Sequence, residues 1–170
     1  MKINKRRRLE NKTNYNKRLG LLKSNSLRLV IRKTNKYLIL QVIESKNSED
    51  KVLYSANTKD LLKLGWPQAK AGSLKSITAS YLAGLLLGKK AKDVKGRLVL
   101  DLGLIPNTKG SRVYAAVKGI ADAGIKINYD EKVIPPKESI EGKNNKLTEI
   151  FNKVKGAIKW LKDNKEHQKK

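Results

Sequence analysis

A short apolar run, a basic loop and a stretch of small residues follow one another between positions 96 and 124. The run Leu98–Leu102 is almost entirely apolar, which predicts a strand buried on both faces. Positions 113–123 are rich in alanine and glycine, so we expect a helix that approaches the sheet closely. Ser111 is its expected N-cap and Gly124 its expected end. A strand, a loop and a helix in this order indicate an α/β fold.

The loop between this strand and this helix carries the cations Lys109 and Arg112. It is expected at the carboxyl end of the strand and the amino end of the helix. Free backbone N–H groups and the helix dipole favour anions there. The pattern Gly-x-x-x-x-Gly-Lys-Ser/Thr is absent, so a nucleotide-binding P-loop is not indicated. An ordinary connection with solvated cations explains the loop equally well when it is taken alone.

The net charge of the chain favours one class of binding partner. Lys and Arg number 39 against 15 Asp and Glu, which gives a net charge of +24 over 170 residues. Such an excess favours a polyanionic partner, with nucleic acid the first candidate and an anionic membrane the second. No apolar run approaches the roughly 20 residues that cross a bilayer. No apolar segment follows the basic start, so no secretory signal is indicated.

Cysteine is absent, and His167 is the single histidine. These counts exclude disulfides, thiolate metal sites, a histidine-based metal cluster and a Ser-His-Asp triad. We therefore expect no cofactor and no metal site, and a reduced, cytoplasmic setting fits the composition.

Residues 1–27 are expected to form a basic RNA-binding arm. Up to position 28 the chain holds ten Lys or Arg and one acid, Glu10, together with several asparagines. Such a segment cannot bury enough surface to fold alone, although a short helix over 15–23 is compatible with it. We expect its cations to contact RNA phosphates and Tyr15 to stack on a base or ribose. A disordered solubilising or targeting tail is the alternative.

Residues 28–129 are expected to form a mixed α/β domain. Alternating side chains predict a hairpin over 28–45 that turns at Thr34–Lys36, then a third strand over 51–56. The hairpin face with Arg28 and Arg32 is expected to meet solvent or RNA. Further along, the pattern predicts a helix over 59–64 capped by Thr58, a loose basic segment over 69–76, a strong helix over 77–91 and an edge strand over 125–127.

Residues 130–170 are expected to hold an irregular segment and a C-terminal helix. Positions 130–142 contain Pro135 and Pro136, which favour irregular structure. Apolar residues at three- and four-residue spacing predict an amphipathic helix over 146–162 that docks on protein, and a frayed tail follows it. The stripe consists of Leu147, Ile150, Phe151, Val154, Ile158 and Leu161.

Several motifs together resemble one known family. They are Lys12-Thr13-Asn14-Tyr15, Arg18-Leu19-Gly20-Leu21-Leu22-Lys23-Ser24, Arg28-Leu29-Val30-Ile31-Arg32-Lys33-Thr34-Asn35-Lys36-Tyr37, Gly65-Trp66, Ser80-Tyr81-Leu82-Ala83-Gly84-Leu85-Leu86, Leu100-Asp101-Leu102-Gly103-Leu104 and Lys109-Gly110-Ser111-Arg112-Val113-Tyr114-Ala115-Ala116. In this order they resemble the archaeal and eukaryotic branch of the large-subunit ribosomal protein family that carries 5S rRNA, number eighteen in the large-subunit series. The resemblance spans about residues 12–142.

The resemblance implies a mixed sheet with flanking helices, related in topology to ribonuclease H, and a structural role in translation. It implies docking of 5S rRNA in the central protuberance, beside 23S rRNA and neighbouring ribosomal proteins, in the cytoplasmic large subunit and away from membranes. With the cations of the arm and the basic loop added, the predicted RNA-binding residues are Arg6, Arg7, Arg8, Lys12, Tyr15, Lys17, Arg18, Lys23, Arg28, Arg32, Asn35, Lys36, Lys109 and Arg112.

Within this set we expect a division of labour. The arm carries charge without fixed geometry, so it should supply affinity for any polyanion. The hairpin face and the loop with Lys109 and Arg112 hold cations at fixed spacings, so they should recognise one folded RNA by its shape.

Two other classes of function remain open on the sequence alone. A ribonuclease H-like nuclease needs clustered carboxylates for paired metal ions. Asp101 and Asp122 are candidates, but Arg28 and Arg32 stand where acids would be needed, and Asp101 is expected to cap a loop or pair with a cation. A membrane-surface protein would use the C-terminal helix, whose polar face carries Lys153, Lys155, Lys159 and Lys162.

Overall fold

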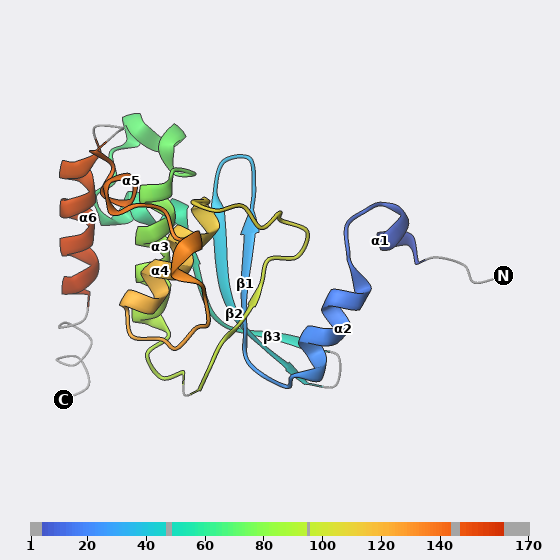
Figure 1. Ribbon diagram of the computed structural model, residues 1–170. Coiled ribbons are helices and arrows are strands. Elements are labelled where there is room, and N and C mark those ends of the chain that lie inside the picture. Colours follow the sequence, from blue (N-terminus) through green and yellow to red (C-terminus); the bar gives the residue numbers. More distant parts are fainter. Residues whose placement is uncertain (1–4, 47–48, 95, 144–146, 162–170) are drawn as a thin grey trace.

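The computed structural model describes residues 5–46, 49–94, 96–143 and 147–161 (Figure 1). The expected tail 163–170 with His167 lies outside the described residues. Lys146 and Lys162, the expected limits of the last helix, also lie outside them.

A four-stranded mixed sheet forms the centre of the protein. Its strands are β1 (Arg28–Lys33), β2 (Leu38–Lys46), β3 (Glu49–Asn57) and β4 (Val99–Asp101), in the spatial order β3-β2-β1-β4. β2 runs antiparallel to both β1 and β3, and β4 runs parallel to β1. The predicted hairpin, the third strand and the α/β class are confirmed.

The fourth strand differs from its prediction in burial. Asp101 and the preceding Leu98 are buried, whereas Val99, Leu100 and Leu102 are half-buried. The reason is its place at the edge of the sheet, where β1 is its sheet partner. The expected strand over 125–127 is reduced to one parallel bridge between Leu98 and Ile127.

Helices cover one face of the sheet in two layers (Figure 1). α3 (Ile77–Lys90) and α4 (Arg112–Asp122) lie next to each other, and α6 (Thr148–Trp160) packs on α3 farther from the sheet. α3 is buried from Thr78 to Gly88, which explains its almost wholly apolar sequence. Ser76 caps it by accepting a hydrogen bond from the Ala79 backbone N–H at 3.2 Å.

The small residues of α4 serve its packing on α3 rather than on the sheet, which corrects the prediction. A Cβ atom added to Gly84 of α3 would collide with the backbone of Ala116 in α4. One added to Gly119 of α4 would collide with the backbone of Tyr81 in α3. The two backbones therefore approach closely at points where one of the two helices has a glycine and so no side chain. Gly124, with φ of 99°, ends the helix as predicted.

The short elements depart from their predictions in detail. Asn57, not Thr58, caps the 3-10 helix η1 (Thr58–Leu64), because the Thr58 hydroxyl accepts instead from the Leu38 N–H at 3.1 Å. The segment expected to be loose contains a second 3-10 helix, η2 (Gln68–Ser73). The segment expected to be irregular contains η3 (Glu131–Val133) and α5 (Lys137–Glu141).

The apolar stripe of α6 faces the core as predicted, except at its last member: Leu161 follows the end of the helix and is exposed. Phe151, Val154 and Ile158 are buried, and the Phe151 ring lies 5.8 Å from the Tyr81 ring between centroids. Trp160 at the end of the same helix is 68% exposed. The apolar face of α6 therefore packs on the core of the same protein.

Candidate nucleic-acid interface

The N-terminal arm extends on the side of the sheet away from α3, α4 and α6 (Figure 1). It consists of α1 (Arg6–Leu9) and α2 (Tyr15–Lys23), neither of which contains a buried residue. The helix expected over 15–23 is confirmed. Asn14 caps it, because its Oδ1 accepts a hydrogen bond from the Lys17 N–H at 3.1 Å.

Hydrogen bonds close the turn between the two arm helices. The N–H groups of Lys12 and Thr13 both donate to the Arg7 carbonyl, at 2.9 and 3.1 Å, and Arg7 Nε donates to the Thr13 hydroxyl at 2.9 Å. Asn11 adopts the left-handed conformation, with φ of 49°. The arm therefore has a defined local structure at this turn that the sequence did not indicate, and its expected role in supplying affinity stays a prediction.

A groove of about 880 Å³ separates the arm from β1, β4 and the loop that follows β4. Six cations line it, and Asp101 is the single acid among the described residues that do so. Its walls also include apolar side chains such as Leu100, Leu102 and Ile105. The cations are Arg7, Lys12, Lys17, Arg18, Arg32 and Lys33.

A chain of alternating charges connects the arm to the sheet. Arg18 of α2 contacts Asp50 at 3.2 Å, and Asp50 contacts Arg28 at 2.7 Å. Arg28 contacts Asp101 at 2.9 Å, and Asp101 contacts Arg32 at 3.1 Å. The five side chains come from α2, β1, β3 and β4, so the network links the arm helix, through Asp50 of β3, to Arg28 of β1 and Asp101 of β4.

Asp50 has an altered acidity within this network. Burial acts to raise the pKa of the Asp50 carboxyl, but hydrogen bonds from Ser45 and Arg28 and the charges of Arg28 and Arg18 outweigh it. The net effect places this pKa below its ordinary value, because each partner favours the ionised carboxylate.

Asp101 holds Arg32 in place at the groove. One carboxylate oxygen of Asp101 accepts from Arg32 Nη2 and from the Gly103 N–H, and the Asp101 carbonyl accepts from Arg32 Nη1. Gly103, at φ of 61°, lies flat against the guanidinium, where an added Cβ would come within 3.2 Å of Arg32 Cζ. The prediction that Asp101 pairs with a cation is confirmed.

Arg28 differs from the other predicted contacts because it is 2% exposed. Its guanidinium donates to Asp101, Asp50 and Ser45, which orients it inward. An RNA contact by this residue stays a prediction that requires these bonds to open.

The basic loop occupies its predicted place between β4 and α4. Lys109 is exposed and Arg112 half-buried, and neither has an ion-pair partner in the part of the chain that the structure describes. Gly110 donates its N–H to the Val133 carbonyl at 2.9 Å. Ser111 stands at the N-cap position, but its side chain makes no capping bond, and its hydroxyl oxygen is buried.

The remaining predicted residues lie outside the groove. Asn35 and Lys36 are exposed at the turn of the hairpin, and Lys23 is exposed at the end of α2. Arg6 is held by Glu10 at 2.7 Å within α1. The structure thus brings five of the fourteen predicted residues together in one groove: Arg7, Lys12, Lys17, Arg18 and Arg32.

Arg8 and Tyr15 line a second, smaller recess on the arm itself. Lys5 lies over the Tyr15 ring, with Nζ 4.7 Å from the centroid. Sequence reasoning missed Lys33 and Leu104 as members of these two hollows. The density of asparagines in the arm was a signal that pointed toward the smaller recess.

The two carboxylates considered for catalysis are both engaged. Asp101 pairs with two arginines, and Asp122 accepts from the Tyr81 hydroxyl at 2.9 Å and pairs with Lys118 at 3.1 Å. Within the described ranges, no group of three or more His, Cys, Asp or Glu side chains is placed to hold a metal ion. These ranges also contain no helix that is long and apolar enough to span a membrane.

Comparison with known proteins gives consistent results. The model of the family "Ribosomal large subunit proteins 60S L5, and 50S L18" matches residues 1–97. The large ribosomal subunit protein uL18 of Korarchaeum cryptofilum is 44% identical over 144 residues, which cover 84% of this chain and 72% of that protein. The uL18 protein of Methanoregula boonei is 37% identical over 163 residues, which cover 92% of this chain and 91% of that protein.

Proposed function

The chain belongs to the family of ribosomal large-subunit proteins 60S L5 and 50S L18, and from this membership we propose that it binds 5S rRNA and attaches it to 23S rRNA in the central protuberance. The family resemblance seen in the motifs is confirmed, and the chain is a constituent of the large ribosomal subunit rather than an enzyme. We also propose that it contacts neighbouring proteins of the large subunit.

The cationic groove is the observation that supports RNA as the ligand of this surface. Six cations and one acid among the described residues line it. That acid, Asp101, already contacts Arg28 at 2.9 Å and Arg32 at 3.1 Å, so its single negative charge is shared between two arginines. Lys17 and Lys33 have no ion-pair partner in the described ranges, so their charge is available to phosphates. RNA phosphates are the anionic groups that such unpaired cations would neutralise.

The proposed contact residues fall into three groups. The groove contributes Arg7, Lys12, Lys17, Arg18 and Arg32, and the arm outside it contributes Arg6, Arg8, Tyr15 and Lys23. The hairpin turn and the basic loop contribute Asn35, Lys36, Lys109 and Arg112, and Arg28 is proposed to act chiefly by holding Asp50 and Asp101.

Salt dependence tests this proposal with a matched pair of variants. The native chain, the double variant Lys17→Ala with Lys33→Ala, and the control Lys59→Ala with Lys63→Ala are titrated with 5S rRNA and a same-length control RNA at several salt concentrations. Both control lysines are exposed and lie in η1, outside the groove.

Each lost phosphate contact lowers the slope of log affinity against log salt by roughly 0.7–0.9. The groove variant should therefore lose about 1.5 from this slope, and the control should keep the native slope. A native chain that binds both RNAs equally, or groove and control variants that behave alike, would refute the proposal.

A further inference from the structure

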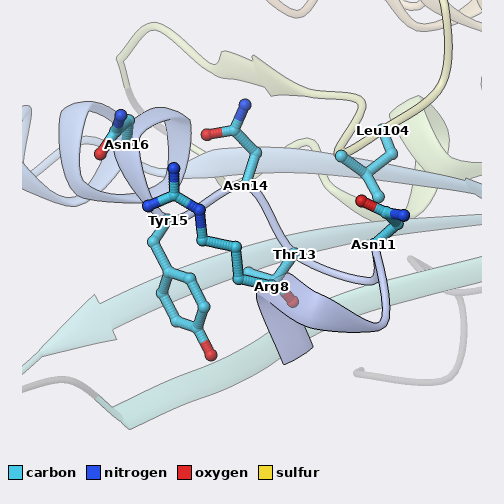
Figure 2. A pocket seen from close by; sticks show the side chains of 7 residues that line it. All are labelled: Arg8, Asn11, Thr13, Asn14, Tyr15, Asn16 and Leu104. Carbon is cyan, nitrogen blue, oxygen red and sulfur yellow. The ribbon is translucent and has the colours of Figure 1, made fainter. Parts of the chain in front are cut away.

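The smaller recess on the arm has a different character from the groove. Its volume is about 250 Å³, and it lies between the two arm helices and the loop after β4 (Figure 2). Three asparagines, one threonine, one tyrosine and one arginine line it together with Leu104. No carboxylate is among the described residues that line it.

Much of the hydrogen-bonding capacity around this recess is unused. The side-chain oxygen of Asn14 accepts a hydrogen bond from the Lys17 N–H at 3.1 Å. Both protons of the Asn14 amide nitrogen are therefore free to donate. In the part of the chain that the structure describes, the side chains of Asn11 and Asn16 make no hydrogen bond. The Thr13 oxygen accepts from Arg7, so its own proton is still available to donate.

These groups are held in fixed positions. The two bonds from the Lys12 and Thr13 N–H groups to the Arg7 carbonyl close the turn that carries Asn11, and Asn14 follows this turn as the N-cap of α2. The left-handed backbone conformation of Asn11 determines the direction in which its side chain leaves the chain. Figure 2 shows the side-chain amide of Asn11 beside Leu104. Leu104 belongs to the body of the protein and is 51% exposed, so it offers an apolar wall to whatever enters.

We propose that this recess receives one unstacked base of the bound RNA, and that the arm thereby reads sequence as well as phosphate. The inference rests on the proposed function, because it takes RNA as the partner. Amides offer donors and acceptors to an uncharged base edge, whereas phosphates are better held by the cations of the adjacent groove. Sequence-specific proteins commonly recognise splayed RNA bases in this way, by edge hydrogen bonds with stacking on an aromatic ring or a guanidinium.

Size supports a single base as the occupant. Pockets for drug-sized ligands measure about 300–1,000 Å³, and this recess falls just below that range. Arg8 supplies a planar guanidinium, and Tyr15 supplies a ring with Lys5 Nζ 4.7 Å from its centroid. Either plane gives a base a face to stack on. The expected role of the arm, affinity without preference, is replaced by one in which it contributes to recognition.

Two substitutions remove two of the three amides and preserve the backbone. Asn11→Gly suits the positive φ at this position, and Asn14→Ser keeps an oxygen that caps α2. The matched control is Asn25→Gly, since Asn25 also has a positive φ, 46°, but does not line the recess. All chains are full length, and circular dichroism checks that their helix content is the same.

The native chain, the Asn11→Gly/Asn14→Ser variant and the control are titrated with 5S rRNA and a same-length control RNA. Reagents that modify unpaired base edges then map protected bases in each complex. The double variant should bind 5S rRNA about tenfold more weakly, with the control RNA and the salt slope unchanged. One unpaired 5S rRNA base should be protected from these reagents by the native chain and by the Asn25→Gly control. The same base should react with them in the complex with the double variant.

Three results overturn the inference. Equal weakening for both RNAs means that the recess holds only phosphate or supports the arm. An unchanged 5S rRNA preference with unchanged protection means that no base is read there, and the proposed function then still stands. A native chain with no preference for 5S rRNA refutes the proposed function, and the base-reading role with it.

Discussion

The guanidinium of Arg28 donates to the carboxylate of Asp101 at 2.9 Å, and only 3% and 7% of the two side chains are exposed. The bond links residues 73 positions apart and joins the start of β1 to the end of β4. It also bears on the proposed RNA-binding surface, because the same carboxylate orients Arg32 at the groove.

Replacing Asp101 should destabilise the fold, since a buried arginine then loses a partner. We expect Asp101→Asn to lower the free energy of unfolding by about 3 kcal/mol, because breaking a buried ion pair leaves one charge uncompensated. Urea denaturation measures this change. The exposed Asp93→Asn serves as the control and should stay within about 0.5 kcal/mol of the native chain. Equal midpoints for both variants would show that the buried pair contributes little.

Asp50 should make stability depend on acid pH. Its pKa is lower in the folded chain than in the unfolded chain, so its contribution is fully present above the ordinary value near 4. The contribution is lost as the pH falls through the lower, folded pKa. The unfolding free energies of the native chain and Asp50→Asn should therefore differ at pH 6 and converge at the most acid pH. A constant difference across this range would contradict the assigned role.

Phe151 and Trp160 form a natural comparison within α6. Phe151 is 4% exposed, and Trp160 is 68% exposed. Phe151→Ala should cost about 3–5 kcal/mol of unfolding free energy, because it leaves a cavity beside Tyr81. Trp160→Ala should cost less than about 0.5 kcal/mol. Thermal or urea denaturation of both variants tests the docking of α6, and similar losses would argue against it.

Glycines in two helices should respond in opposite directions to alanine. Gly84 of α3 faces the backbone of Ala116 in α4, so Gly84→Ala overpacks the contact and should cost at least about 1–3 kcal/mol. An alanine Cβ at Gly156 of α6 would meet open space. Gly156→Ala should therefore raise the free energy of unfolding by about 0.5–1 kcal/mol, because alanine restricts the conformations of the unfolded chain. Calorimetry compares their melting temperatures, and a stabilising Gly84→Ala would refute the close approach.

Local patterns allowed much of the fold to be predicted from the sequence. Alternation over 28–45 indicated the β1–β2 hairpin, and the apolar stripe containing Phe151 indicated the buried face of α6. These features depend on neighbours in the chain, which the sequence displays. The half-burial of Val99 could not be read in this way, because it depends on β4 lying at an edge.

The sequence allowed the cations of the candidate site to be predicted, but not how the fold arranges them in space. Lys17 and Arg32 were identified as cations, but their position in one groove follows from the Arg18–Asp50 contact across 32 positions. Arg28 was predicted to be available to solvent or RNA, and two distant carboxylates turn it inward. The recess beside Leu104 also needs the arm and a loop some ninety positions later. Tertiary contacts of this kind leave no periodic trace in a sequence.

The parallel pairing of β1 with β4 has a consequence for synthesis of the chain. A ribosome makes the first three strands before the carboxylate at position 101 exists, so Arg28 waits without this partner while the meander emerges. Contacts of such large separation are costly to close and slow to form. The buried pair of Arg28 with Asp101 can therefore close only after β4 has been made, although the arm that precedes β1 is the first part of the chain to be synthesised.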